Sequence, residues 1–176
     1  MEFWQLALEI TGWLVVSLLL LLASLALAVP FFRGAWFVPI PAAIVGKIIA
    51  KAELGPADRV ADIGSGDGRL VLAAARAGAQ VFGIEINPVL VWWTRLKIKK
   101  TGLADQVEIK LGNFWHSDFS SYNVILVYGL DRVMRDLGGK LKKELRPSSR
   151  IFSYKFQFPN FLLYKAHGDG IYEYRI

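Results

Sequence analysis

The chain has 176 residues and no cysteine, and its hydrophobic fraction of 54% exceeds the roughly 45–50% of an ordinary soluble domain. The missing cysteines exclude disulfides, thiolate zinc sites and cysteine nucleophiles. Lys and Arg exceed Asp and Glu by six. The apolar excess is concentrated near the N-terminus, so we separate a terminal segment from one domain of ordinary size in residues 34–176.

The N-terminal segment is a candidate membrane anchor. Residues 10–32 carry no charge, and as a helix they would reach about 34 Å, enough to cross a hydrocarbon core of about 30 Å. A cleaved secretory signal is the competing interpretation. It would need a basic start, whereas this chain has Glu2 and Glu9 there, and the apolar run is long for a signal peptide. We therefore expect an uncleaved transmembrane anchor over residues 1–33.

Basic residues predict the orientation of the anchor. Arg33, Lys47 and Lys51 follow the span closely, so the positive-inside rule places the domain on the cytoplasmic side of a single-pass protein. No basic amphipathic targeting segment precedes the span, which favours a prokaryotic plasma membrane.

The next stretch, residues 34–57, is expected to be a linker followed by a pre-domain helix. The two prolines of residues 38–41 predict a stiff extended link. Apolar residues then recur at helical spacing over residues 42–54, and Gly55-Pro56 is expected to stop that helix.

The remaining residues, 58–176, alternate between short apolar runs and helical patterns. We predict strands at residues 59–63, 80–86, 107–111, 123–128 and 150–156, and helices at residues 70–77, 88–100 and 131–146. This alternation predicts an α/β domain, a Rossmann-like, doubly wound and mainly parallel sheet. Residues 161–166 and 171–176 are expected to add an antiparallel hairpin at one edge.

A glycine cluster directly follows the first predicted strand. It reads Asp62-Ile-Gly-Ser-Gly-Asp-Gly-Arg69. A dinucleotide fingerprint would need its third glycine at position 69, and a P-loop would need a following Gly-Lys-Ser/Thr, so both are disfavoured. What remains is a loop almost without side chains at the carboxyl end of a strand, where ligands bind in such sheets.

Two carboxylates stand at the ends of neighbouring predicted strands. Glu85 lies 17 residues beyond Gly68, a spacing that suits an acid holding both hydroxyls of a ribose. Asp62 would repel a pyrophosphate but would tolerate an ammonium or sulfonium group. S-adenosylmethionine carries a ribose and both cations and has no phosphate, so it is the cofactor that the pattern favours.

With these residues in place, the sequence resembles the class I, seven-strand S-adenosylmethionine-dependent methyltransferases. Three segments are closest to the small membrane-anchored protein-lysine methyltransferases that modify the adenine nucleotide translocase and the ATP synthase c-subunit. These segments are residues 62–69, Gly83-Ile-Glu-Ile-Asn-Pro88 and Asn113-Phe-Trp115. The similarity extends from the end of the anchor through residues 156–159.

The resemblance implies roles for individual residues. Asp62 and the loop glycines would line the methionine half of the cofactor, Glu85 would hold the ribose, and Asn113 would meet the adenine amino group. The family usually has aspartate at position 113. The full set of expected cofactor-binding residues is Asp62, Gly64, Ser65, Gly66, Asp67, Gly68, Glu85, Asn87, Asn113 and Phe114.

The acceptor side of the reaction is expected after the fourth strand. Tyr128 could orient an acceptor, and Asp131 could take its proton, although Asp131 is also well placed to cap the following helix. Lysine needs no dedicated base, since desolvation beside a sulfonium lowers its pKa. The sequence Tyr128-Gly-Leu-Asp131 lacks the Asn/Asp-Pro-Pro-Tyr/Phe pattern of nucleobase methylation.

Partners follow from these features. Membrane lipid around the anchor and a membrane-protein substrate are expected, whereas nucleic acid is disfavoured because no aromatic-basic stacking surface is evident. His116 and His167 have no ligand-spaced partner, so they are expected to be surface or turn residues and no metal is expected. The alternatives left open are methylation of a lipid, a quinone or another small molecule, and an inactive, methyltransferase-like binding protein.

Overall fold

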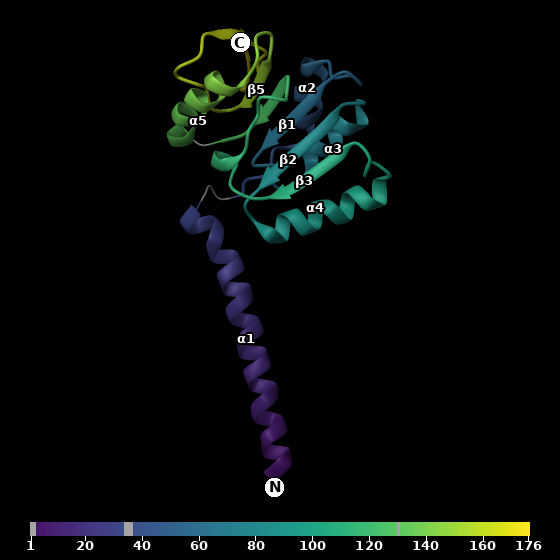
Figure 1. Ribbon diagram of the computed structural model, residues 1–176, viewed down its shortest axis with the longest axis vertical. Coiled ribbons are helices and arrows are strands. Elements are labelled where there is room, and N and C mark those ends of the chain that lie inside the picture. The colour runs from purple at the N-terminus through teal and green to yellow at the C-terminus, as the bar shows by residue number, and fades with distance from the viewer. Residues whose placement is uncertain (1–2, 34–36, 130) are drawn as a thin grey trace. The chain divides into compact units, whose positions relative to one another are not determined.

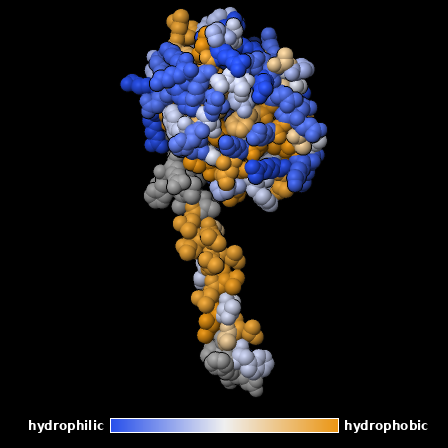
Figure 2. Space-filling view, in the orientation of Figure 1, coloured by the Kyte–Doolittle hydropathy of each residue, from blue (hydrophilic) through white to orange (hydrophobic). Residues whose placement is uncertain are grey.

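The computed structural model describes residues 3–33, 37–129 and 131–176. The chain divides into two units, residues 1–36 and 37–176. The first unit holds the helix α1 (Phe3–Arg33). Within it, residues 7–25 are long and apolar enough to cross a membrane, with none of that stretch buried (Figure 2). A signal sequence near an N-terminus has the same apolar character.

The second unit is a seven-stranded sheet with helices on both faces (Figure 1). The strands are β1 (Arg59–Ile63), β2 (Gln80–Glu85), β3 (Val107–Leu111), β4 (Val124–Val127), β5 (Arg150–Tyr154), β6 (Leu163–Ala166) and β7 (Ile171–Arg175). Their order is β3-β2-β1-β4-β5-β7-β6. β1 to β5 run parallel, and β7 is antiparallel to both β5 and β6. The predicted doubly wound sheet with an antiparallel edge is confirmed.

The helices are α2 (Ala42–Ala52), α3 (Arg69–Arg76), α4 (Pro88–Thr101) and α5 (Asp131–Glu144), with a short 3-10 helix η1 (Phe114–His116). One core lies between the sheet and the helices α2, α3 and α4. A second core, on the other face, contains three buried residues of α5, Met134, Leu137 and Leu141. The connection from β3 to β4 carries only η1, which the sequence did not predict.

Several predicted boundaries were displaced by local backbone conformation. The helix expected over residues 42–54 ends at Ala52, because Glu53 turns into the left-handed region at φ 46° and its N–H bonds Ile49 O. The strand expected to reach Phe156 ends at Tyr154. Lys155 has φ 63°, and the Phe156 N–H returns to Tyr154 O at 2.8 Å. In both cases the backbone leaves its regular conformation before the expected end, which was Gly55 for the helix and Phe156 for the strand.

The residues before α2 belong to the packed unit. Ile40 is buried in the same core as β1 and α3, and its carbonyl accepts a hydrogen bond from Arg69 Nη1. The extended Pro-rich stretch expected over residues 38–41 is therefore in contact with the start of α3.

Candidate cofactor and active site

The candidate site lies at the carboxyl ends of β1, β2 and β4. β1 pairs with β2 on one side and β4 on the other, and Ile63 is in register with Ile84 and Val127. The next residues along β1 and β4, Gly64 and Tyr128, therefore leave the sheet at the same edge. The parallel register brings the glycine loop, Glu85 and Tyr128 to one end of the sheet, as the sequence predicted.

The glycine loop requires its glycines for two different reasons. Gly64, Gly66 and Gly68 all have positive φ, at 77°, 55° and 77°, a region that side chains disfavour. Gly68 also lies against α4, since a Cβ there would come within 2.3 Å of Thr94 Cγ2. Thr94 is fully buried, and its hydroxyl donates to Gly66 O at 3.3 Å. Thr94 of α4 thus contacts both Gly66 and Gly68 and supports the glycine loop. The sequence did not predict this role.

Glu85 joins the end of β2 to this loop. Its Oε2 accepts from Gly66 N and its Oε1 from Asn87 N, both at 2.9 Å. A carboxylate has about four acceptor positions, so each oxygen keeps capacity for a ligand hydroxyl. Asn87 is the N-cap of α4, with its side chain accepting from Val89 N. The predicted N-cap role of Asn87 is confirmed. The cap holds Asn87 in place, and the backbone N–H of Asn87 in turn orients Glu85.

Asp62 is a buried carboxyl, and no cation of the described residues forms an ion pair with it. Burial, with smaller contributions from the charges of Glu85 and Asp67, raises its pKa from 3.8 to about 8. Because the folded pKa exceeds the unfolded one, this group stabilises the unliganded fold most below pH 4, and that contribution is lost as pH rises towards 8. A cationic ligand would relieve the same repulsion.

Asp67 has a different environment from Asp62. Its carboxylate contacts Arg69 Nε at 2.8 Å and Lys97 Nζ at 3.3 Å. Partial burial would raise the pKa of Asp67, but the hydrogen bond from Arg69 and the charges of Lys97 and Arg69 outweigh it and lower the pKa. The Asp67 side chain is thus occupied by protein cations, and Lys97 ties the loop to α4.

The other expected cofactor residues surround this centre. Ser65 is buried, and its hydroxyl has no partner among the described residues. Asn113 caps η1 by accepting from Trp115 N at 3.1 Å, which leaves one lone pair on its oxygen. Phe114 packs on Trp115 with ring centroids 4.7 Å apart. Phe37, which the sequence did not single out, lies over Gly66, because a Cβ on that glycine would meet its ring at 2.6 Å.

Aromatic rings surround Tyr128, at the end of β4 where the acceptor is expected. Tyr128 is half-buried, and its ring centroid lies 5.1 Å from that of Tyr154 and 6.1 Å from that of Phe156. Asp131 is exposed and is the first residue of α5, inside its first turn. The capping position before it, residue 130, lies outside the described residues.

His167 lies in the predicted turn between β6 and β7, but it is more buried there than a surface residue. The His167 side chain is almost fully buried, and its Nε2 lies 2.8 Å from Glu173 Oε2. It holds the β6–β7 edge together instead of facing solvent.

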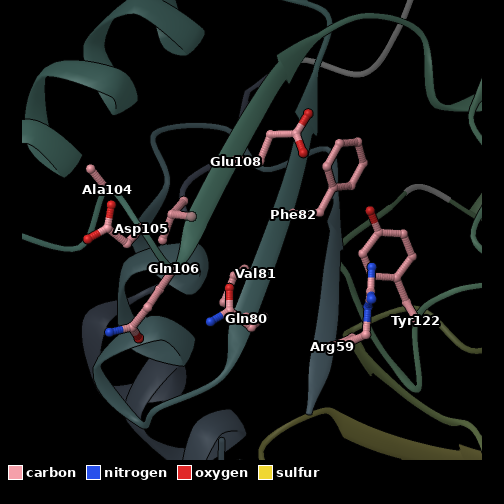
Figure 3. A pocket seen from close by; sticks show the side chains of 10 residues that line it. Arg59, Gln80, Val81, Phe82, Ala104, Asp105, Gln106, Glu108 and Tyr122 are labelled. Carbon is pink, nitrogen blue, oxygen red and sulfur yellow. The ribbon is translucent and has the colours of Figure 1, made fainter. Parts of the chain in front are cut away.

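An open groove lies at the amino ends of the parallel strands, away from the glycine loop (Figure 3). Its volume is about 360 Å³, and it is lined at the amino ends of β1, β2 and β3 by Arg59, Gln80, Phe82, Gln106, Glu108 and Tyr122, among others. Because ligands of such sheets bind beyond the carboxyl ends of the strands, we assign the cofactor to the glycine loop and not to this groove.

The residues present fit S-adenosylmethionine. A glycine loop allows close backbone approach, Glu85 offers free acceptor positions, and Asp62 is a buried carboxyl to which the described part of the chain brings no cationic partner. Together with the strand order, this site defines a class I S-adenosylmethionine-dependent methyltransferase fold.

Comparisons with known proteins agree with that class. Residues 62–164 match the family model described as "ANTKMT methyltransferase domain". The chain belongs to this family, and the resemblance found in the sequence is confirmed.

Individual relatives carry lysine methyltransferase names. The human lysine N-methyltransferase of the ATP synthase c-subunit is 32% identical over 157 residues, 86% of this chain and 67% of that protein. The Xenopus laevis protein of the same name is 38% identical over 112 residues, 64% of this chain and 50% of that protein. A protein-lysine N-methyltransferase of Saccharolobus islandicus (strain REY15A) is 33% identical over 123 residues, 69% of this chain and 76% of that protein. The chain thus spans between half and two thirds of the human and Xenopus laevis relatives.

Among solved structures, an RNA methyltransferase from Salinibacter ruber in complex with S-adenosyl-L-homocysteine is similar to this chain. Its TM-score is 0.75 with 35% sequence identity, and the similarity covers 79% of this chain and 94% of that one.

Proposed function

We propose that this protein transfers a methyl group from S-adenosylmethionine to the side-chain amine of a lysine in a membrane protein. The observation that carries the cofactor part is the joint placement of the glycine loop, Glu85 and the uncompensated Asp62 at one edge of the sheet. The lysine part is supported by the names of several relatives, including those from human and Saccharolobus islandicus.

Each site residue then has a defined role towards the bound cofactor. Glu85 accepts the ribose hydroxyls while its own position is fixed by Gly66 N and Asn87 N. Asp62 and the backbone of the glycine loop would hold the cationic methionine half, and Asn113 would accept from the adenine amino group. Phe37 covers the loop from the side of residues 37–41.

Methyl transfer to an amine does not require a dedicated general acid or base from the protein. The cofactor supplies an electrophilic methyl group on a sulfonium. The acceptor nitrogen must arrive deprotonated and in line, so the enzyme mainly desolvates and orients it. Tyr128, held between Tyr154 and Phe156, is placed to orient the amine. The exposed carboxylate of Asp131 can pass the released proton to water.

The apolar helix α1 supports a membrane location. We assign it as a single-pass anchor with the catalytic unit on the cytoplasmic side of a prokaryotic plasma membrane. Tethering raises the effective concentration of membrane substrates around the site. Relatives named for methylating lysine in the ATP synthase c-subunit and in the adenine nucleotide translocase agree with a membrane-protein substrate.

A second candidate is methylation of RNA. It is favoured by one observation, the similarity to the Salinibacter ruber chain whose structure carries that description. The sequence Tyr128-Gly-Leu-Asp131 is unlike the nucleobase-methylating pattern, and we therefore rank RNA second.

The test is to incubate the detergent-solubilised protein with methyl-labelled S-adenosylmethionine and membranes from the source cell, then separate protein, lipid and RNA. The variant Glu85→Ala is the matched control. The proposal predicts label in a discrete protein band with the wild type only, and acid hydrolysis should release methylated lysine. Label in RNA or in lipid would replace lysine as the acceptor. Binding of cofactor with no label in any fraction would favour an inactive binding protein.

A further inference from the structure

An exposed apolar face on α4 has no role in the site described above. Val89, Trp92 and Trp93, which we call the tryptophan face, occupy positions i, i+3 and i+4 of α4 and therefore lie on one side of the helix. Their exposed fractions are 52%, 59% and 50%. Side chains of this size are costly to leave in water, and a contiguous exposed group of them indicates a binding surface.

The opposite side of α4 is fully engaged. Val91, Thr94 and Ile98 are buried beneath it, Thr94 supports the glycine loop, and Arg95 Nη2 donates to Ile109 O at 2.7 Å. Figure 1 shows α4 on the outside of β2 and β3, with no other element of residues 37–176 on its outer side. The tryptophan face is therefore exposed in a helix that is otherwise tightly fixed.

The charge of the same helix selects the kind of partner. α4 contains Arg95, Lys97, Lys99 and Lys100 and no acidic residue. Lys99 and Lys100 are exposed one to two turns beyond the tryptophans, and Lys97 Nζ lies 5.8 Å from the Trp93 ring. Tryptophan followed by lysine on one helix face matches the interfacial layer of a bilayer with anionic headgroups, where indole rings reside and cations are attracted to the surface.

We propose that the tryptophan face docks the catalytic unit onto the surface of an anionic bilayer, with Val89, Trp92 and Trp93 in the interfacial layer and Lys99 and Lys100 among the headgroups. The proposal rests on the membrane assignment of α1, which keeps this unit within reach of lipid. Docking would hold α4, and with it Thr94, Lys97 and the glycine loop, at the lipid surface, where lysines of membrane proteins emerge.

The absence of cysteine in the chain allows a direct test. Full-length protein carrying Val89→Cys is labelled with an environment-sensitive fluorophore and reconstituted into phosphatidylcholine vesicles with about 30% phosphatidylglycerol, a composition that gives an anionic surface. A nitroxide-labelled lipid serves as quencher. Lys143→Cys is the matched control, because it is exposed on α5.

The label at position 89 should be quenched about threefold or more relative to the label at position 143, as expected for a group in the interfacial layer. Adding Trp92→Glu and Trp93→Glu should bring quenching to the control level, whereas Leu162→Glu, at a residue 90% exposed elsewhere, should not. Omitting phosphatidylglycerol should weaken quenching. Equal quenching at both positions, or quenching insensitive to the tryptophan substitutions, would overturn the proposal.

Two further outcomes separate this proposal from the others. If the protein fails to float with the vesicles, the anchor assignment and the docking proposal both fail. If it floats but the label at position 89 is shielded only in membranes from the source cell and never in pure lipid, the face binds a protein and lipid docking is refuted. Neither outcome affects cofactor binding or methyl transfer, which are measured separately.

Discussion

The contact between Gly68 and Thr94 gives a prediction whose magnitude can be worked from the structure. Gly68 has φ 77°, and a Cβ there would lie 2.3 Å from Thr94 Cγ2, while Gly102 has φ 70° and open space around its Cβ position. A left-handed conformation costs a non-glycine residue about 1–2 kcal/mol. Forcing a methyl group against a fully buried threonine adds about 1–3 kcal/mol. Gly68→Ala should therefore lower the free energy of unfolding by about 2–5 kcal/mol. Gly102→Ala should lower it by only about 1–2 kcal/mol, the cost of the left-handed conformation.

The assay is urea-induced unfolding of the full chain in non-ionic detergent, followed by near-ultraviolet circular dichroism. The variant Thr94→Ser removes the contacted methyl and retains the hydroxyl that donates to Gly66 O. The double variant should therefore be more stable than the sum of the two single effects predicts, by about 1 kcal/mol or more. Equal losses for Gly68→Ala and Gly102→Ala, or strict additivity with Thr94→Ser, would refute the claim that α4 supports the loop through this contact.

Three further predictions concern the rest of the site and the sheet edge. Phe37→Ala should weaken S-adenosylhomocysteine binding about fivefold, since about 1 kcal/mol of apolar contact is lost, while the exposed neighbour Val38→Ala should leave it unchanged; calorimetry that ranks the two alike would disprove the covering role of Phe37. Because the pKa of Asp62 is about 8, binding of the cationic cofactor should release a proton and strengthen as pH rises from about 6 to 8. Asp62→Asn should abolish both effects, and proton release that persists in this variant, measured in buffers of different ionisation enthalpy, would contradict the assignment. Glu173→Gln weakens a buried pair at the far edge of the sheet, so it should lower the unfolding free energy by about 1–3 kcal/mol without changing cofactor affinity, and a loss of affinity would show that the edge is coupled to the site.

Local sequence signals predicted most of the fold. Asn87 followed by Pro88 marked the start of α4 correctly, because capping and the proline N1 position are decided by neighbouring residues. The apolar runs of β1 and β3 have the predicted bounds. Alternation of strands and helices then left few topologies, and the observed mainly parallel sheet with its antiparallel β6–β7 hairpin is the predicted one.

Other features depended on contacts that no local pattern encodes. η1 is a three-residue turn capped by Asn113, too short to show periodicity. The burial of Ile40 and the bond from Arg69 to its carbonyl link residues far apart in the chain. His167 lies in the predicted turn between β6 and β7, but its burial was not predictable, because its partner Glu173 faces it only after β6 and β7 pair.

The residues of the candidate site also fall into two groups, those that the sequence predicts and those that only the structure identifies. The glycines, Glu85 and Asp62 were predictable, because they lie in or directly after the last residues of strands whose carboxyl ends meet at one end of a parallel sheet. Thr94 and Phe37 were not, because their importance comes from the missing side chains of Gly68 and Gly66. A glycine in a sequence shows that space or a special φ is needed, but not which residue fills the space.

The central claim is that Glu85 at the end of β2 holds the ribose of S-adenosylmethionine. The direct measurement is calorimetric titration of the full-length protein in detergent with S-adenosylhomocysteine, for the wild type, Glu85→Ala and the control Glu108→Ala on exposed β3. The structure predicts that Glu85→Ala weakens binding by about 1.5–3 kcal/mol, the scale of charge-assisted hydrogen bonds, and that Glu108→Ala leaves it unchanged. Wild-type affinity in the Glu85→Ala protein would contradict the assignment of this edge of the sheet as the cofactor site.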